Sequence, residues 1–337
     1  MNIREQLEEN EYKILSPYAS HSRETWGRDR EEPLCDMRTE YQRDRDRIIH
    51  CKSFRRLKHK TQVFLAPEGD HYRTRLTHTL EVSQIARSIS KALMLNEDLT
   101  EAIALGHDLG HTPFGHAGER ALNDICSFGF THYEQSVRIV EKLEREGRGL
   151  NLTKEVRDGI LNHRTSGHPS TPEGKVVRLS DKIAYINHDI DDAIRAGILS
   201  EEDIPQEYRD ILGGNTKTRL DTLIHDIVRN SQGKDDIIMS DRVGNAMREL
   251  REFMFDSVYT NKKAKGQEKK AESMIKALYG YYMNNNGALP EEYKYHIDKL
   301  GEKPERVVCD YIAGMSDQYS VMKFEELFVP TFWKEKQ

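Results

Sequence analysis

The sequence contains few cysteines, few aromatic residues and no long hydrophobic run. Only 4 of the 337 residues are cysteines, and 8% are aromatic. The cysteines lie far apart with no CxxC pair, which argues against a thiolate metal site and a disulfide framework. This usage is typical of a reducing compartment, so we expect a cytoplasmic protein. No stretch approaches the roughly 18 apolar residues of a membrane span, and we expect no membrane partner.

The usual glycine-rich phosphate-binding motifs are also missing. In the loop 164–175, six residues separate Gly167 from Gly174, and Val176 stands where a P-loop needs Ser or Thr. There is no GxGxxG run. The formal net charge of -6 gives no overall attraction to nucleic acid. Nucleic acid is a possible partner, but no feature of the sequence indicates it. Any nucleotide should therefore be recognised by side chains that converge between helices.

The residues that are abundant indicate a helical protein with much solvated surface. Hydrophobic residues make up 36% and charged residues 32% of the chain, and apolar positions recur at three- and four-residue spacing. We predict an all-α fold. Residues 1–40 are expected to form an N-terminal arm, residues 41–200 a core, and residues 201–337 a helical part packed on that core within one continuous domain.

Three predicted helices each carry a potential metal ligand toward the interior. Each ligand lies four residues from an apolar position of a helical stripe, and an aspartate follows the second histidine directly. Two imidazoles and two carboxylates suit Mn²⁺, Fe²⁺ or Mg²⁺ better than a thiolate-loving ion. Polar groups that are satisfied within the core are the alternative; it is reasonable for one residue and weak for all four. The candidate ligands are His78, His107, Asp108 and Asp181.

The order His, His-Asp, Asp resembles that of the HD superfamily of metal-dependent phosphohydrolases. The segments YQRDRDRIIHCKSFRRLKHKTQVF, HDLGHTPFGHAGE and CDYIAGMSDQYS, at 41–64, 107–119 and 309–320, resemble the dGTPase-like deoxynucleoside triphosphate triphosphohydrolases. The resemblance implies an HD-domain helical fold with a metal site at the centre of the bundle. It also implies cleavage of a dNTP into deoxynucleoside and inorganic triphosphate. Many members are homo-oligomers whose activity responds to nucleotide, so a second dNTP is a candidate effector.

A glycine-rich segment beside the predicted metal cluster carries candidate catalytic residues. His116 and Glu119 are three residues apart, so the carboxylate can hold one ring nitrogen and make the imidazole a proton donor. The resemblance implies a catalytic histidine–acid pair at this position and a functional histidine at His132. His111 is a further candidate near the phosphates, and a capping or ligand-supporting role is an equal alternative.

Basic residues are concentrated at 43–60. For most of them we favour a solvated, self-paired helix face, in which the basic side chains pair with nearby acids. Arg75 lies three residues before His78 and faces the same side of a helix start, within reach of a phosphate. For most other positions ordinary polar surface is the alternative, and for Tyr259 it is core packing. The resemblance implies phosphate contacts for Arg75, Lys182 and Lys262, and sugar contacts for Gln62, Tyr185, Asp189 and Tyr259.

Two other functions remain open at this stage. One is a different HD phosphohydrolase that acts on a nucleoside monophosphate, a cyclic nucleotide or a guanosine alarmone. The other is a catalytically silent module that senses dNTP or binds nucleic acid and uses the metal structurally. The sequence does not identify the preferred base.

Overall fold

A computed structural model describes residues 1–62, 73–259 and 262–330, with only the backbone at 259 and 262–266. Within this part the chain forms helices and no strand, apart from one isolated bridge between Thr61 and Thr74. The predicted all-α fold is therefore confirmed. Among the helices described, none combines the length and the apolar character that would let it traverse a lipid bilayer.

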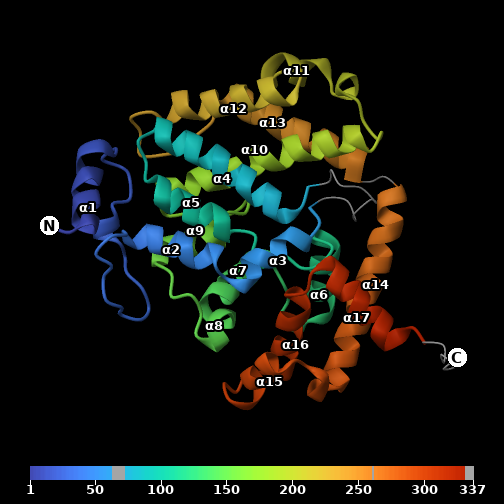
Figure 1. The fold of residues 1–337 in the computed structure, drawn as a ribbon. Coiled ribbons are helices and arrows are strands. Elements are labelled where there is room, and N and C mark those ends of the chain that lie inside the picture. The colour runs from blue at the N-terminus through green and yellow to red at the C-terminus, as the bar shows by residue number, and fades with distance from the viewer. Residues whose placement is uncertain (63–72, 260–261, 331–337) are drawn as a thin grey trace, which may run out of the picture.

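Three long helices form the centre of the molecule. α4 (Arg75–Ala92), α5 (Glu97–Gly106) and α10 (Pro172–Arg195) pack against one another, as Figure 1 shows. The apolar stripes seen in the sequence point into this bundle, where Val82 and Ile103 are fully buried. Burial of such stripes is the main source of helix stability in a folded protein. The central core therefore forms from the stripes that the sequence periodicity predicts.

The start of each central helix is fixed by a side-chain cap. The Thr74 hydroxyl accepts a hydrogen bond from the backbone N–H of Thr77 at the start of α4. Asn96 caps α5 by accepting from the N–H groups of Asp98 and Leu99. Such caps satisfy amides that have no partner within the helix. They determine where α4 and α5 begin, and so which residues lie near the site.

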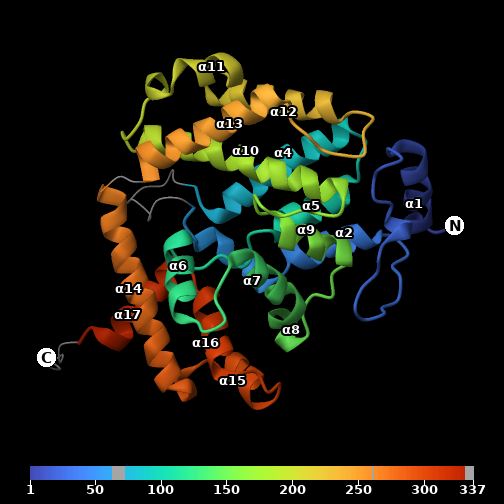
Figure 2. The same cartoon turned by 180° about the vertical axis from the view of Figure 1, so that it is seen from behind.

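A second hydrophobic core lies beside the first. α6 (His116–Ile125) packs against α14 (Lys262–Asn284), and α16 (Pro304–Ala313) and α17 (Asp317–Phe328) also contact α14. Their apolar residues form a cluster separate from that of the central helices. Figures 1 and 2 show these helices as one group beside the bundle. α6 thus connects the region of the site to the C-terminal helices.

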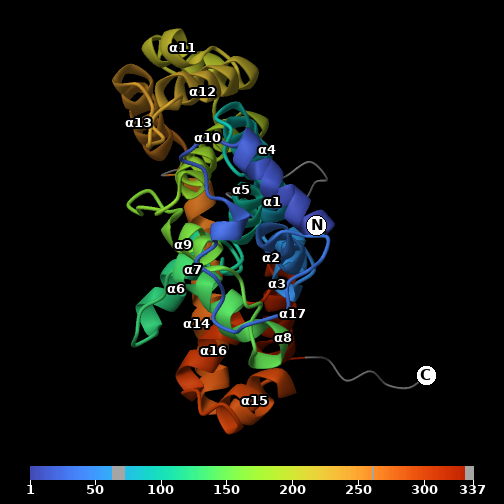
Figure 3. The same ribbon diagram turned by 90° about the vertical axis from the view of Figure 1, so that its left-hand side faces the viewer.

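A third group of helices covers one side of α10. α11 (Gln206–Leu212), α12 (Thr216–Ser231) and α13 (Asp241–Met254) belong to the same hydrophobic core as the central bundle. Figure 3 shows them as a layer at one end of the molecule. Because α13 packs against α10, its polar face borders the site described below.

The remaining elements are shorter or peripheral. The other α-helices are α1 (Ile3–Ile14), α2 (Glu40–Ile49), α3 (Lys52–Arg56), α7 (His132–Arg138), α8 (Glu144–Gly147), α9 (Lys154–Asn162) and α15 (Glu291–Asp298). Two π-helical segments are η3 (Ile139–Leu143) and η5 (Phe255–Tyr259). The short 3₁₀ segments are η1 (Ser22–Glu24), η2 (Leu57–His59), η4 (Glu201–Asp203) and η6 (Asn286–Ala288).

The arginines of α2 are paired with acids. Arg43 binds Glu40 at 2.7 Å and Glu32 at 3.1 Å. Arg45 lies 3.1 Å from Asp98, and the guanidinium of Arg47 binds Glu32 as well. These three arginines are therefore paired, as the self-paired interpretation expects. Arg43 and Arg47 hold the loop before α2 against the helix, and Arg45 joins α2 to α5.

Candidate active site

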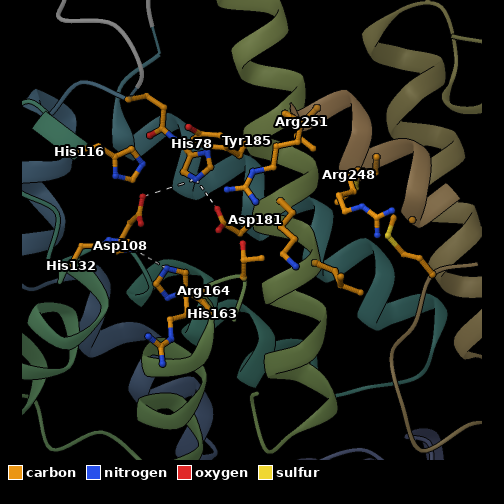
Figure 4. A pocket seen from close by; sticks show the side chains of 18 of the residues that line it. His78, Asp108, His116, His132, His163, Arg164, Asp181, Tyr185, Arg248 and Arg251 are labelled. Carbon is orange, nitrogen blue, oxygen red and sulfur yellow. Dashed lines mark hydrogen bonds and ion pairs between the residues drawn. The ribbon is translucent and has the colours of Figure 1, made fainter. Parts of the chain in front are cut away.

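The four candidate metal ligands come together from three separate segments. His78 lies in the first turns of α4, His107 caps the C-terminus of α5 with Asp108 next to it, and Asp181 lies in the middle of α10. His78 Nε2 is 3.1 Å from Asp181 Oδ1, and His107 Nε2 is 3.6 Å from the same oxygen. Figure 4 shows His78, Asp108 and Asp181 converging at the cavity wall.

The protonation of His107 suits a cation ligand. Its Nδ1 donates a 2.6 Å hydrogen bond to the carbonyl oxygen of Ala104, which leaves Nε2 without a proton in the neutral ring. Nε2 is buried with no hydrogen-bond partner, and it lies 3.4 Å from Asp108 Oδ1. A bare nitrogen facing carboxylate oxygens is the arrangement a divalent ion requires. The residues present therefore fit a metal ion.

The electrostatics of the cluster favour a cation. Burial alone would lower the pKa of His107, but the carboxylates of Asp108 and Asp181 raise it to about 9, so the ring holds a proton at neutral pH that a bound metal ion would displace from Nε2. Burial would raise the pKa of Asp108 and of Asp181, yet nearby imidazoles, and Arg75 at Asp108, hold both pKa values well below the usual range. Both carboxylates are thus ionised and negative in a largely buried position.

Arg75 lies beside the cluster. Its guanidinium donates a 2.8 Å hydrogen bond to Asp108 Oδ2, and the residue is only 2% exposed. Arg75 Nε is buried without a partner among the described residues. The arginine is therefore held in one orientation at the cavity wall, where a phosphate group would meet it; that contact stays a prediction.

Glu119 holds two histidines rather than one. It accepts hydrogen bonds from His116 Nδ1 at 3.2 Å and from His132 Nδ1 at 2.9 Å. The His116 side chain is 53% exposed, whereas that of His132 is 15% exposed. Burial opposes ionisation of Glu119, but the two histidines lower its pKa below the usual range. The predicted His116–Glu119 contact is present, and the structure adds His132 to it.

His111 is stacked on His132. The two ring centroids are 4.0 Å apart with an interplanar angle of 12°, and His111 Nε2 lies 3.2 Å from Asp108 Oδ1. Burial, Arg75 and His132 hold the pKa of His111 well below its usual value, so the ring is neutral. His111 thus lies between the candidate metal ligands and the Glu119 group. This position is compatible with both roles predicted for it, a contact near the phosphates and the support of a ligand.

The sequence interpretation missed His163. This residue caps α9, and its Nδ1 donates to the carbonyl oxygen of Ile160 at 2.7 Å. Its Nε2 lies 3.4 Å from His132 Nε2, and its ring packs edge-on against His107. Burial lowers its pKa to about 4. A signal was available, because His163 ends an apolar stripe through Val156 and Ile160 in the way that His107 ends its own.

The predicted substrate residues lie at different depths. Gln62, Lys182 and Tyr185 line the cavity, as Arg75 does. Asp189, one turn after Tyr185, is fully buried behind the lining, and burial raises its pKa well above the usual value. The side chains of Tyr259 and Lys262 lie outside the described residues, so their predicted contacts stay predictions.

The cavity has a volume of about 510 Å³ and a cationic wall that the sequence interpretation also missed. Arg248 and Arg251 of α13 line it, and neither forms an ion pair with another described residue. Burial, and then Arg178 and Arg251, lower the pKa of Lys182, although Asp181 opposes them, which indicates an excess of positive charge around this side chain. In Figure 4, Arg248 and Arg251 lie across the cluster from His116.

Comparisons with known proteins agree with this geometry. An HD domain model matches residues 75–186, and a phosphohydrolase-associated domain model matches residues 237–326. A deoxyguanosinetriphosphate triphosphohydrolase-like protein of Caldanaerobacter subterraneus subsp. tengcongensis is 59% identical over 100% of this chain and 98% of its own length. The chain belongs to the deoxyguanosinetriphosphate triphosphohydrolase-like family of HD-domain proteins.

Other members and one solved structure extend the comparison. A deoxyguanosinetriphosphate triphosphohydrolase-like protein of Clostridium perfringens is 51% identical over 98% of this chain and 99% of its own. A phosphohydrolase from Bacteroides thetaiotaomicron matches 83% of this chain and 67% of its own with a TM-score of 0.53 and 16% identity, which shows a shared fold alone. As a member of this family, the chain is an HD-type phosphohydrolase with a cluster of histidines and aspartates that could hold a metal ion.

Proposed function

We propose that this protein hydrolyses deoxynucleoside triphosphates to a deoxynucleoside and inorganic triphosphate, in a reaction that requires a divalent metal ion. The observation that carries the proposal is the cavity, which joins the candidate metal ligands to a wall of cationic side chains. Its volume of about 510 Å³ lies within the range of small-molecule sites, about 300–1,000 Å³. The names of the relatives support the same substrate class.

His78, His107, Asp108 and Asp181 are the proposed ligands of the metal. When bound there, a divalent ion would polarise a phosphate group and lower the pKa of water. The nitrogen and oxygen donors fit Mn²⁺, Fe²⁺ or Mg²⁺.

Cationic side chains would bind the triphosphate tail. Arg75 borders the metal ligands, and both Arg75 and Lys182 line the cavity. Arg251 approaches from α13. Charge-assisted hydrogen bonds from these groups would neutralise the negative charge that grows on the phosphates as the bond breaks.

The leaving group requires a proton. Water attacks the α-phosphorus and releases one proton to the solvent, the bond from phosphorus to the 5'-oxygen breaks with its electron pair on oxygen, and that oxygen takes up a proton from an acid of the protein. His116 is our first choice as the donor and His132 the second, because Glu119 orients both rings. His111 would support the phosphates or the ligand Asp108.

The sugar would lie toward α10. Gln62, Tyr185 and Asp189 are the proposed contacts, with Asp189 accepting from the 3'-hydroxyl. Tyr259 would pack beneath the deoxyribose, and Lys262 would add a phosphate contact. Assembly into a homo-oligomer, activation by a second dNTP and a cytoplasmic location stay predictions.

Product analysis tests the proposal. The purified protein is incubated with all four dNTPs, Mn²⁺ and Mg²⁺, and the products are separated by anion exchange. We expect tripolyphosphate and free deoxynucleosides. Pyrophosphate, orthophosphate or monophosphates would assign the protein to another HD reaction, and dNTP binding without turnover would favour a sensor or a missing activator. An Asp181→Asn variant, which removes one proposed ligand charge, should lose bound metal and activity together.

A further inference from the structure

Behind His78 lies a chain of hydrogen bonds that the catalytic proposal does not use. His78 Nδ1 is 3.2 Å from His188 Nδ1 on α10. His188 Nε2 is 2.8 Å from a carboxylate oxygen of Glu81 on α4, and Glu81 also accepts from Arg73 Nε at 3.1 Å. The chain begins in the buried cluster, where His78 and His188 are 1% and 5% exposed, and it ends at Glu81, whose side chain is 39% exposed.

With a metal ion on His78 Nε2, proton counting gives this chain one direction. The Glu81 carboxylate can only accept a hydrogen bond, so His188 Nε2 carries a proton. A neutral His188 then has a bare Nδ1, which accepts the proton of His78 Nδ1. His78 Nε2 is left bare and faces Asp181 Oδ1 at 3.1 Å and Asp108 Oδ2 at 4.0 Å. In the reverse arrangement the His78 proton would lie on Nε2, where it would donate to Asp181 and block a metal ion, and bare His188 Nε2 would face the Glu81 carboxylate.

We propose that His188 and Glu81 are positioning residues that fix His78 in the tautomer whose Nε2 binds the metal. The proposal rests on the metal site of the proposed function. The ring of His107 is oriented in the same way by a backbone carbonyl, that of Ala104. The two imidazole ligands are thus oriented by different means, and only the support of His78 can be removed by substitution.

The predicted consequence is on metal affinity. Outer residues that orient a ligand histidine typically change metal affinity by roughly 10- to 100-fold. His188→Phe keeps a ring but removes the acceptor, and Glu81→Ala removes the anchor of His188. We expect both variants to bind Mn²⁺ roughly 10- to 100-fold more weakly than the parent. His188→Asn places an amide oxygen near the position of Nδ1, so its affinity should stay closer to that of the parent.

Calorimetric titration of the chelator-treated full-length protein with Mn²⁺ measures this directly. Gln84→Ala, on the exposed side of α4, and His225→Phe, on the exposed face of α12, serve as matched controls and should bind like the parent. Circular dichroism and thermal midpoints in chelator report whether each variant folds. Glu81 is 39% exposed, so Glu81→Ala is expected to fold even if His188→Phe does not.

The outcomes separate this inference from the proposed reaction. Equal Mn²⁺ affinity of the parent, Glu81→Ala and a folded His188→Phe would overturn the positioning role and leave the proposed function standing. Weaker binding by these variants, in a parent that hydrolyses no dNTP, would support the positioning role and overturn the proposed reaction. A parent that binds no Mn²⁺ would overturn both.

Discussion

At the scale of single residues, the partner of Nδ1 distinguishes the histidines around the site. A backbone carbonyl holds Nδ1 of His107 and of His163, whereas the carboxylate of Glu119 holds His116 and His132. A carbonyl accepts the proton of Nδ1 and leaves Nε2 as the nitrogen that can act as a ligand or an acceptor. A carboxylate stabilises the protonated ring, which suits an acid. The roles proposed here follow from that difference.

His116→Ala tests the assignment of the proton donor. We expect kcat to fall by about 10²–10⁴-fold, because the leaving 5'-oxygen loses its acid, while dNTP binding is retained. Kinetics and equilibrium binding of the same sample measure both quantities. His132→Ala is the comparison, since Glu119 holds that ring as well. If His116→Ala hydrolyses dNTP as fast as the parent, His116 is not the acid.

A second residue-level prediction concerns stability in acid. Partial burial opposes ionisation of Glu32, but hydrogen bonds from Arg47 and Asn151 lower its pKa from 4.5 to about 2. The folded state therefore binds fewer protons than the unfolded state between these values, so this stabilisation is complete above pH 4.5 and is lost as the pH falls toward 2. Glu32→Gln should lower the thermal midpoint at pH 6, and its difference from the parent should shrink toward pH 2.

Glu31→Gln is the matched control for Glu32→Gln, because it removes the same charge from an exposed neighbour that forms no ion pair among the described residues. A constant difference between Glu32→Gln and the parent across this pH range would contradict the account.

At the scale of elements, the position of α7 depends on a close approach at Gly110. A Cβ built there would lie 2.2 Å from the backbone nitrogen of Ser136 and 2.3 Å from the carbonyl oxygen of His132. The Gly110 N–H also donates to the Ser136 hydroxyl at 2.8 Å. Only glycine lets the segment after Asp108 touch the helix that carries His132, so this contact sets the distance between the metal cluster and the Glu119 group.

Gly110→Ala should displace α7. We expect the free energy of unfolding to fall by about 1–3 kcal/mol from overpacking and hydrolysis to fall with it, measured by denaturant titration and turnover. Gly280→Ala is the control, because a Cβ in that turn of α14 meets nothing within 4 Å. It should stabilise the protein by about 0.5–1 kcal/mol through helix propensity. Unchanged stability of Gly110→Ala would contradict the close packing.

The helical periodicity predicted the helices themselves better than the contacts between distant helices. The stripes leading to His78, His107 and Asp181 were sufficient to predict three inward-facing helices, because burial follows a local pattern. Arg248 and Arg251 were missed because their position in the cavity depends on how α13 packs against α10, a contact between distant segments. The support of His78 by His188 was missed for the same reason, although both histidines lie on predicted helices.

At the scale of the whole molecule, polar contacts beside the cavity join the two hydrophobic cores. Asp317 at the start of α17 accepts hydrogen bonds from the Thr61 N–H and hydroxyl and from the Phe114 N–H, at 2.6–2.9 Å. Lys60, buried nearby, donates to the carbonyl oxygens of His111 and Ala313. The C-terminal helices thus hold the loop that carries His111 and leads to His116 at the start of α6.

Asp317→Ala should weaken this connection. Loss of the acceptor leaves partly buried donors without partners, at about 1–3 kcal/mol each, so the thermal midpoint should fall and dNTP hydrolysis should decrease. Asp298→Ala, at the exposed end of α15, is the control and should change neither. An Asp317→Ala protein with the parent's stability would show that the two cores are held together elsewhere.

The central claim is hydrolysis at the α-phosphorus, and isotope placement tests it most directly. The protein is incubated with a dNTP and Mn²⁺ in water enriched in ¹⁸O, and both products are analysed by mass spectrometry. The account predicts one ¹⁸O in the released triphosphate and none in the deoxynucleoside. Label in the deoxynucleoside, or in pyrophosphate or orthophosphate formed instead of triphosphate, would contradict it.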